Sequence, residues 1–191
     1  MLAVFDFLVC VSALWAYLQC RRNSITDILA PAGFLLIAAA AIIGTARYAF
    51  LPELLTAHKA VSLAASVYGV PAIAIGFFLA AENLGRRRYF QLAAAALLLL
   101  SLLAYRDPLF VLLIGVAAQI IWILAAVRFH KVYPGLPLPV AISILFVSVA
   151  GLVFARPGST LSIQNENWFH GLLAIGIVQQ GIAFIRIRPR S

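Results

Sequence analysis

Three side chains in this sequence have the chemistry of metal ligands. His58, Glu166 and His170 each stand near the start of an apolar stretch. Glu166 and His170 are four residues apart, so on a helix both side chains can point at one ion. With His58 as a third ligand and water in the fourth position, the set has the layout of a catalytic zinc site, in which the metal acidifies the bound water. The sequence therefore predicts zinc held by His58, Glu166 and His170.

A serine follows His58 by one helical turn. Ser62 is positioned to orient the metal-bound water or to stabilise an oxyanion, so we expect it to assist catalysis. Two stripes of mostly small residues recur at helical spacing, namely His58, Ser62, Ser66 and Gly69, and His170, Ala174, Val178 and Gly181. Two explanations stay open: either these faces pack together, as small residues allow, with each histidine satisfied locally, or both faces line one pocket.

The amino-acid composition indicates whether a soluble or a membrane-embedded fold positions these residues. Of the 191 residues, 64% are hydrophobic and 10% are charged, whereas soluble domains have about 45–50% and about 25%. The mean hydropathy is +1.05. The net charge of +8 arises from basic residues at the ends of apolar stretches, where they set topology and contact anionic lipid. We predict an integral membrane protein whose partners are membrane lipids and not nucleic acid.

Seven stretches have about the length that a membrane-spanning helix needs. They are Leu2–Gln19, Ile25–Tyr48, Leu54–Ala81, Tyr89–Tyr105, Leu109–Phe129, Leu138–Ala155 and Trp168–Ile187. All connections between them are short, and the longest is Arg156–Asn167. We therefore predict an all-α fold, a single seven-transmembrane-helix bundle over residues 1–191.

The basic residues predict the orientation of this bundle. One side holds Arg21, Arg22, Arg86, Arg87, Arg88, Arg128, Lys131, Arg186, Arg188 and Arg190, and the other holds only Arg47, Lys59, Arg106 and Arg156. Because positive charge accumulates on the cytoplasmic side, we expect the N-terminus outside and the C-terminus in the cytoplasm of a plasma (inner) membrane protein.

Ionisable residues of both signs gather at the predicted outer end. They are Asp6, Arg47, Glu53, His58, Lys59, Arg106, Asp107, Glu166 and His170. Ionisable groups at membrane depth are costly and generally functional. This end of the bundle is therefore the expected location of any site.

The run from Glu166 to Gly176, which contains Phe169-His170, resembles the start of the last helix in the alkaline ceramidase and progestin-receptor-like (CREST) superfamily of seven-helix membrane hydrolases. In that family two histidines stand four apart, and Glu166 occupies the first position here. The segment Gly44–Tyr48 matches the family's second-helix region but lacks its histidine, and His58 follows near the family's acidic position. The resemblance implies zinc-assisted hydrolysis of an amide or ester bond in a lipid.

Three functions are consistent with these observations. The first is a metal-assisted hydrolase that takes a lipid-like substrate from the outer leaflet. The second is a non-enzymatic binder, transporter or sensor that uses the same cavity for a lipid or another small molecule. The third is a structural or assembly protein with a dry, tightly packed outer end. A transporter is disfavoured because the two halves show no internal repeat.

Overall fold

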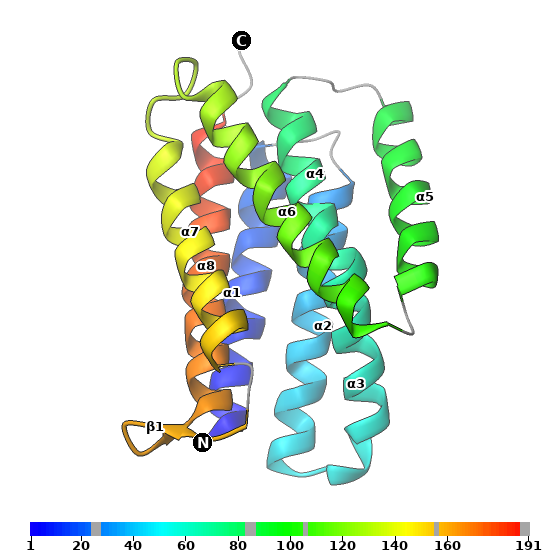
Figure 1. Ribbon diagram of the computed structural model, residues 1–191, viewed down its shortest axis with the longest axis vertical. Coiled ribbons are helices and arrows are strands. Elements are labelled where there is room, and N and C mark those ends of the chain that lie inside the picture. Colours follow the sequence, from blue (N-terminus) through cyan, green and yellow to red (C-terminus); the bar gives the residue numbers. More distant parts are fainter. Residues whose placement is uncertain (24–27, 83–86, 105–106, 155–156, 188–191) are drawn as a thin grey trace.

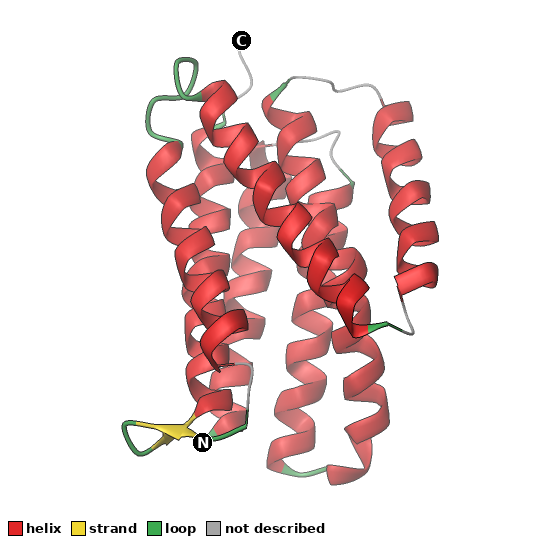
Figure 2. Ribbon diagram, in the orientation of Figure 1, coloured by secondary structure: helices red, strands yellow, loops and turns green. Residues whose placement is uncertain are grey.

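The computed structural model describes residues 1–23, 28–82, 87–104, 107–154 and 157–187. Figure 2 shows helices running along nearly the whole length of the molecule. The α-helices are α1 (Leu2–Asn23), α2 (Leu29–Ala49), α3 (Leu55–Ala64), α4 (Val70–Ala81), α5 (Arg87–Ala104), α6 (Pro108–Phe129), α7 (Pro137–Val149) and α8 (Asn165–Arg186). A short 3-10 turn, η1 (Pro52–Leu54), precedes α3. The expected all-α class is confirmed.

Six of the described helical segments are long and apolar enough to cross a membrane, so the chain is an integral membrane protein. They are Leu2–Arg22, Leu29–Ala49, Pro52–Ala81, Leu109–Phe129, Pro137–Phe154 and Asn165–Arg186. The apolar part of α5, Arg88–Ser101, is shorter than these six, so a seventh crossing stays a prediction. The predicted span ends at Ile25, Tyr105 and Ala155 lie outside the described residues.

The helices pack in an order that differs from their order along the chain. Helix α1 packs between α2 and α8, α7 covers α8, and α4 lies against both α2 and α6. Helix α5 stands at the edge, against α4 and η2 (Figure 1). The N-terminus lies at the lower end of the bundle in Figure 1, and α8 runs from that end to the opposite one. We call the lower end the N-terminal end.

An aromatic cluster fills the centre of the bundle. The Phe77 and Trp122 rings are stacked with centroids 4.2 Å apart, and Phe184 meets Phe77 edge-on at 5.1 Å. Phe34 meets Phe184 at 6.0 Å. Side chains from α2, α4, α6 and α8 thus interlock, and all four are buried. Aromatic contacts of this geometry add about 0.5–1.5 kcal/mol each beyond the area they bury.

Two segments are π-helical: η2 (Ala65–Gly69), between α3 and α4, and η3 (Ala150–Phe154), which continues α7. Pro71 follows η2, and a proline has no N–H to donate to the carbonyl four residues earlier. That carbonyl belongs to Val67, and it lies 3.1 Å from Ser101 Oγ of α5, which also donates to Leu97 O of its own helix at 2.7 Å. The two carbonyls share the single hydroxyl hydrogen, and the contact with Val67 attaches α5 to the bundle.

The predicted loop Arg156–Asn167 contains a small hairpin. Strands β1 (Ser159–Thr160) and β2 (Ile163–Gln164) pair antiparallel, with Thr160 opposite Ile163. The two turn residues, Leu161 and Ser162, have φ of 53° and 63°, as a type I′ turn requires. Trp168 Nε1 donates to Thr160 O, which attaches the hairpin to the start of α8.

Of the two explanations left open for the small-residue stripes, packing against each other does not occur at their glycines. Gly69 faces Gly33 of α2, and Gly181 faces Trp15 and Ala16 of α1. Each glycine allows close approach to a different helix, because a Cβ at Gly181 would overlap the Trp15 ring. Helix α1 therefore packs where the α3 stripe was expected to lie.

Candidate functional site

A cavity of about 400 Å³ lies in the N-terminal half of the bundle. Residues from α1, α2, α3, η2, α4, α6, α7, η3 and α8 line it, and most of them are apolar. The polar lining groups are Asp6, His58, Ser62, Ser66, Gln119, Ser148 and His170. Its volume is within the usual range of small-molecule sites, about 300–1,000 Å³.

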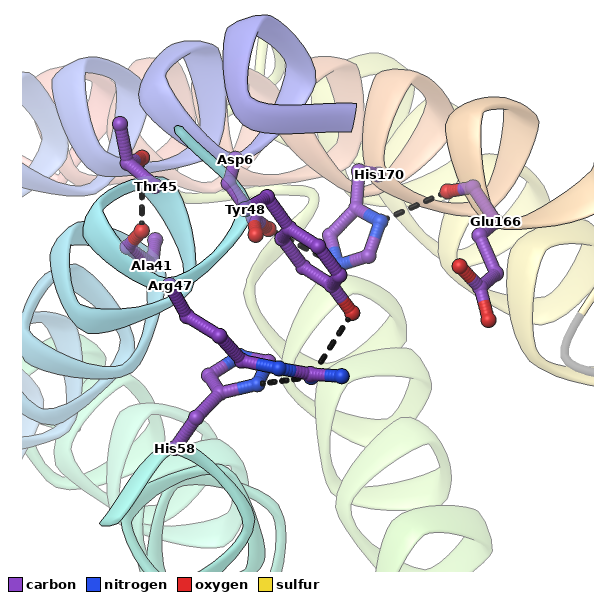
Figure 3. A network of polar contacts seen from close by, with 8 residues as sticks. All are labelled: Asp6, Ala41, Thr45, Arg47, Tyr48, His58, Glu166 and His170. Atoms are coloured by element: carbon purple, nitrogen blue, oxygen red, sulfur yellow. Dashed lines mark hydrogen bonds and ion pairs between the residues drawn. The ribbon is translucent and has the colours of Figure 1, made fainter. Parts of the chain in front are cut away.

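Asp6 and His170 form a buried pair at one end of this cavity. His170 Nε2 lies 3.0 Å from Asp6 Oδ1, and the side chains are 17% and 1% exposed. His170 Nδ1 lies 2.6 Å from the backbone carbonyl oxygen of Glu166 (Figure 3). Helices α1 and α8 pack side by side, which places the two side chains together although they are far apart in sequence.

These contacts define where the protons are. A carbonyl oxygen only accepts, so His170 Nδ1 must carry a hydrogen. His170 Nε2 then faces a carboxylate oxygen, and two lone pairs at that distance would repel each other. One further proton must therefore lie between Nε2 and Oδ1, and the pair is an imidazolium and a carboxylate or their neutral forms. In both cases Asp6 Oδ2 is left as an acceptor without a hydrogen.

Asp6 Oδ2 has no hydrogen-bond partner although it is buried. An unpaired buried acceptor costs about 1–3 kcal/mol and is uncommon in folded proteins. The oxygen belongs to a residue that lines the cavity. The oxygen itself is covered by its neighbours, so a group bound in the cavity has to displace them to pair with it.

His58 of α3 lines the same cavity as Asp6 and His170. Arg47 Nη1 lies 3.1 Å from His58 Nδ1 and also donates to Tyr48 Oη at 3.0 Å (Figure 3). A guanidinium donates and never accepts. His58 Nδ1 must then accept, so the ring is neutral and carries its hydrogen on Nε2.

Gly44 of α2 allows Asp6 and His58 to pack closely against its helix. A Cβ at this position would overlap Asp6 Oδ2 and lie 2.8 Å from His58 Nε2. The acceptor Asp6 Oδ2 from α1 and the donor His58 Nε2–H from α3 therefore both contact α2 at a position where only glycine fits.

The opposite part of the cavity opens sideways between α6 and α7. Leu112 of α6 and Leu152 of η3 line the cavity and are also 52% and 67% exposed. A Cβ added at Gly115 or Gly151 would meet no atom within 4 Å. Figure 1 shows α6 leaning away from α7 towards the N-terminal end. In a membrane protein this opening faces the acyl chains.

The predicted site residues are brought together only in part. His58, Ser62 and His170 line the cavity, but Glu166 does not. The Glu166 carboxylate points away from the His170 ring, and only its backbone carbonyl contacts the ring (Figure 3). Within the described ranges, no three His, Cys, Asp or Glu side chains are arranged to hold a metal ion.

The tautomer of His58 also disfavours a metal at this end of the cavity. A metal-bound histidine needs a free lone pair on the coordinating nitrogen, and its other nitrogen usually donates to a carbonyl or carboxylate. His170 has such a partner in Glu166 O. His58 instead accepts from Arg47, so its cavity-facing Nε2 carries a hydrogen and the nearby guanidinium is positive. The expected zinc site stays a prediction, and these residues do not favour it.

Sequence reasoning placed Asp6 and Arg47 at the correct end of the bundle but gave them no role. The signal for Asp6 was a single carboxylate within the first apolar span, a position where a charge needs a partner. Gly44 carried no signal, because a glycine in a helix has many explanations. Its role depends on contacts with α1 and α3, which the sequence does not specify.

No protein-family model, curated protein or solved structure matches this chain. The resemblance to the alkaline ceramidase superfamily therefore stays a prediction, and the function has to be argued from the site itself.

Proposed function

We propose that this membrane protein binds an amphipathic, lipid-like molecule in the cavity. The polar group of the ligand lies beside Asp6, His58 and His170, and its apolar part extends towards the opening between α6 and α7. The observation that carries this proposal is Asp6 Oδ2, a buried and unpaired acceptor at the polar end of an otherwise apolar cavity.

The side opening supports a ligand that arrives from the bilayer. Gly115 and Gly151 leave the space between α6 and α7 open, and the exposed rim residues Leu112 and Leu152 are apolar. An alkyl chain there would exchange one apolar environment for another. The polar group would gain partners that the hydrocarbon core cannot offer, where unsatisfied polar groups cost several kcal/mol.

The central aromatic cluster favours a binder over a channel or transporter. On α6, Trp122 follows the cavity residue Gln119 by about one turn, and it is buried against Phe77 and Phe184. These buried rings fill the centre of the bundle beyond Gln119. A ligand that enters from the side is therefore held there.

A second candidate function, hydrolysis of an ester or amide in the bound lipid, is favoured by the proton shared by Asp6 and His170. In this reaction a water molecule that enters the cavity gives a proton to Asp6 Oδ2 while its oxygen bonds to the carbonyl carbon. Ser62 Oγ donates to the carbonyl oxygen. The bond to the leaving group breaks, and this group takes the proton held between Asp6 and His170. The proton on Asp6 then replaces it, so the pair is restored.

The orientation is proposed together with the function. The bias of basic residues supports an external N-terminal end, a cytoplasmic C-terminus, α5 as a seventh span and location in the plasma (inner) membrane. Cysteines introduced as Ser162→Cys and Gly135→Cys test this, since the native Cys10 and Cys20 are buried. An impermeant maleimide added to intact cells should label only the first variant, and the reverse pattern would overturn the orientation.

Cross-linking tests the binding function. The protein is placed in phosphatidylcholine nanodiscs with a long-chain alcohol that bears a diazirine on its alkyl chain, and the labelled residues are mapped by mass spectrometry. We expect saturable labelling of cavity residues such as Val116 and Leu173, and non-saturable labelling of the outer face of α5, for example at Leu99. Labelling that is non-saturable at all positions would contradict the proposal.

Product analysis distinguishes the second candidate from the first. Long-chain esters and amides are incubated with the wild type and with Asp6→Asn, and products are measured by mass spectrometry. Turnover that Asp6→Asn abolishes supports hydrolysis, and saturable binding without turnover leaves binding as the function. Zinc above background in the wild type, lost in His170→Ala, would revive the metal-assisted form.

A further inference from the structure

The turn of the hairpin that precedes α8 is strained and apolar at the same time. Its two central residues, Leu161 and Ser162, have φ of 53° and 63° and are the non-glycine residues with positive φ in the described part of the chain. Turns of this type favour asparagine, aspartate or glycine, because a bulky side chain at positive φ is a steric outlier. Leu161 is nevertheless 81% exposed, so packing within the protein does not explain it.

Several hydrogen bonds hold this hairpin to the start of α8. The Asn165 backbone N–H donates to Gly158 O at 2.9 Å, at the base of the hairpin. Thr160 Oγ1 donates to Asn165 Oδ1 at 2.8 Å, and Thr160 O accepts from Trp168 Nε1 at 3.0 Å. The position of the strained turn is therefore set by α8.

The hairpin lies where two membrane-spanning segments end. It connects the segment Pro137–Phe154 to the segment Asn165–Arg186, so it is located at the surface of the bilayer. Phe154 and Trp168 stack there with ring centroids 5.9 Å apart, and tryptophan is enriched at this level in membrane proteins. Figure 1 shows the hairpin lying across the helix axes and reaching sideways beyond α7 and α8, over the region that lipid occupies.

We propose that Leu161 inserts into the lipid leaflet at the N-terminal end and anchors the hairpin there. Its partner is the boundary between the lipid headgroups and the acyl chains. Interfacial segments bury apolar side chains about 5–10 Å deep in this boundary. Because removal from water favours an apolar side chain in proportion to its area, contact with lipid offsets the backbone strain at Leu161. This inference does not depend on the ligand proposed for the cavity.

The other side chains of the hairpin suit the same position. Ser159, Thr160, Ser162 and Gln164 are polar and exposed, as residues that lie among hydrated headgroups can be. Backbone groups without partners are costly in the hydrocarbon core, which limits how far a turn can enter. A turn with one leucine at its tip therefore enters the leaflet only to the depth of that side chain.

Fluorescence quenching by lipids tests the inference. An environment-sensitive NBD fluorophore is attached to Leu161→Cys and, as a matched control, to Gln164→Cys in the same hairpin. The native Cys10 and Cys20 are buried. Each protein is placed in phosphatidylcholine nanodiscs that carry a doxyl quencher near the headgroup end or near the methyl end of an acyl chain. The affinity of the fluorophore for lipid is common to both sites, so the difference between the sites reports the hairpin.

The depth of the fluorophore gives the expected pattern. The fluorophore at Leu161 should emit at shorter wavelength than the one at Gln164 and should be quenched more strongly by the doxyl group near the headgroup. Ile120, which is 50% exposed near the middle of the segment Leu109–Phe129, provides the deep reference. A fluorophore at Ile120→Cys should be quenched more strongly by the doxyl group near the methyl end.

Photo-cross-linking of the unmodified chain keeps the native leucine in place. Phosphatidylcholine with a diazirine near the headgroup end of one acyl chain is activated in the nanodiscs, and lipid adducts are mapped by mass spectrometry. More adducts at Leu161 than at Gln164 support the inference. The absence of adducts at Leu161 overturns it.

Two fluorescence results would also overturn the inference. The first is equal emission at Leu161 and Gln164 with quenching by aqueous iodide and by neither lipid, which would assign the exposed leucine to a partner outside the membrane. The second is stronger quenching at Leu161 by the deeper doxyl group, which would place the turn in the hydrocarbon core and not at its boundary.

Discussion

Removing the Asp6 carboxylate tests the arrangement on which the site depends. Asp6 is 1% exposed, and its Oδ1 lies 3.0 Å from His170 Nε2. Breaking a buried ion pair costs about 3–5 kcal/mol when the remaining charge persists. Here the remaining imidazolium can lose its proton, so Asp6→Ala should leave a neutral but unpaired Nε2. The expected loss of stability is about 1–3 kcal/mol.

Asp6→Asn is the matched control for this prediction. Its amide can donate to the neutral His170 Nε2 and still place an oxygen where Asp6 Oδ2 lies. The variant exchanges a charge-assisted hydrogen bond for a neutral one, and we expect it to lose about 1 kcal/mol. The difference in stability between Asp6→Ala and Asp6→Asn therefore measures the cost of leaving His170 Nε2 unpaired, separately from the cost of losing the charge.

The assay is reversible unfolding in mixed micelles, followed by circular dichroism, for the wild type, Asp6→Ala, His170→Ala and the double variant. Coupled contacts give interaction energies of about 0.5–3 kcal/mol in such a cycle. We expect a coupling at the upper half of this range. A coupling near zero, or equal stability of Asp6→Ala and Asp6→Asn, would refute the pairing and the proton positions derived from it.

Three further predictions concern other parts of the molecule. Gly44→Ala should lose about 1–3 kcal/mol because its methyl group overlaps Asp6 Oδ2, whereas Gly115→Ala should unfold like the wild type in the same micelle assay. Gly151→Phe should narrow the opening between α6 and α7 and so slow the saturable diazirine labelling of the cavity, with unchanged rates arguing against side access. Hydrogen bonds from Arg128 hold the pKa of the Glu82 carboxyl below its usual value, so this pair stabilises the protein above the unfolded-state pKa of glutamate and its contribution is lost below about pH 4. The stability difference between wild type and Glu82→Gln should be small, because both partners are exposed, and should vanish in acid; a difference that grows as the pH falls would contradict the sign.

Six of the seven expected apolar spans correspond to helices long enough to cross a membrane, because their sequence signal is local, and the seventh stays a prediction. Runs of apolar residues bounded by charges gave Leu109–Phe129, which forms α6 as Pro108–Phe129. The continuous span Leu54–Ala81 was also predicted, but not the π segment within it. That segment depends on Pro71 and on Ser101, a hydrogen-bond partner from another helix.

The site was predicted less completely, because a site in a bundle depends on which helices pack together. The sequence located His58 and His170 at one end, and the structure places both on one cavity. The sequence did not show that α1 packs beside α8. This packing places Asp6, and not Glu166, beside His170 Nε2. The spacing of Glu166 and His170 led us to expect that both side chains point at one ion, but only the backbone carbonyl of Glu166 contacts the His170 ring.

The π segment η2 also has a consequence for sequence length. A residue inserted into a helix rotates everything beyond it by about 100°. His58, Ser62 and Ser66 face the cavity on one side of this insertion, and Phe77 faces the aromatic cluster on the other. The π turn absorbs one extra residue within a single turn, so a single-residue deletion within Ala65–Gly69 would restore a regular helix and keep the two faces of this span in register. A deletion in the regular helix on either side would instead rotate one face away from the other, so this turn is the part of the span that should best tolerate the loss of one residue.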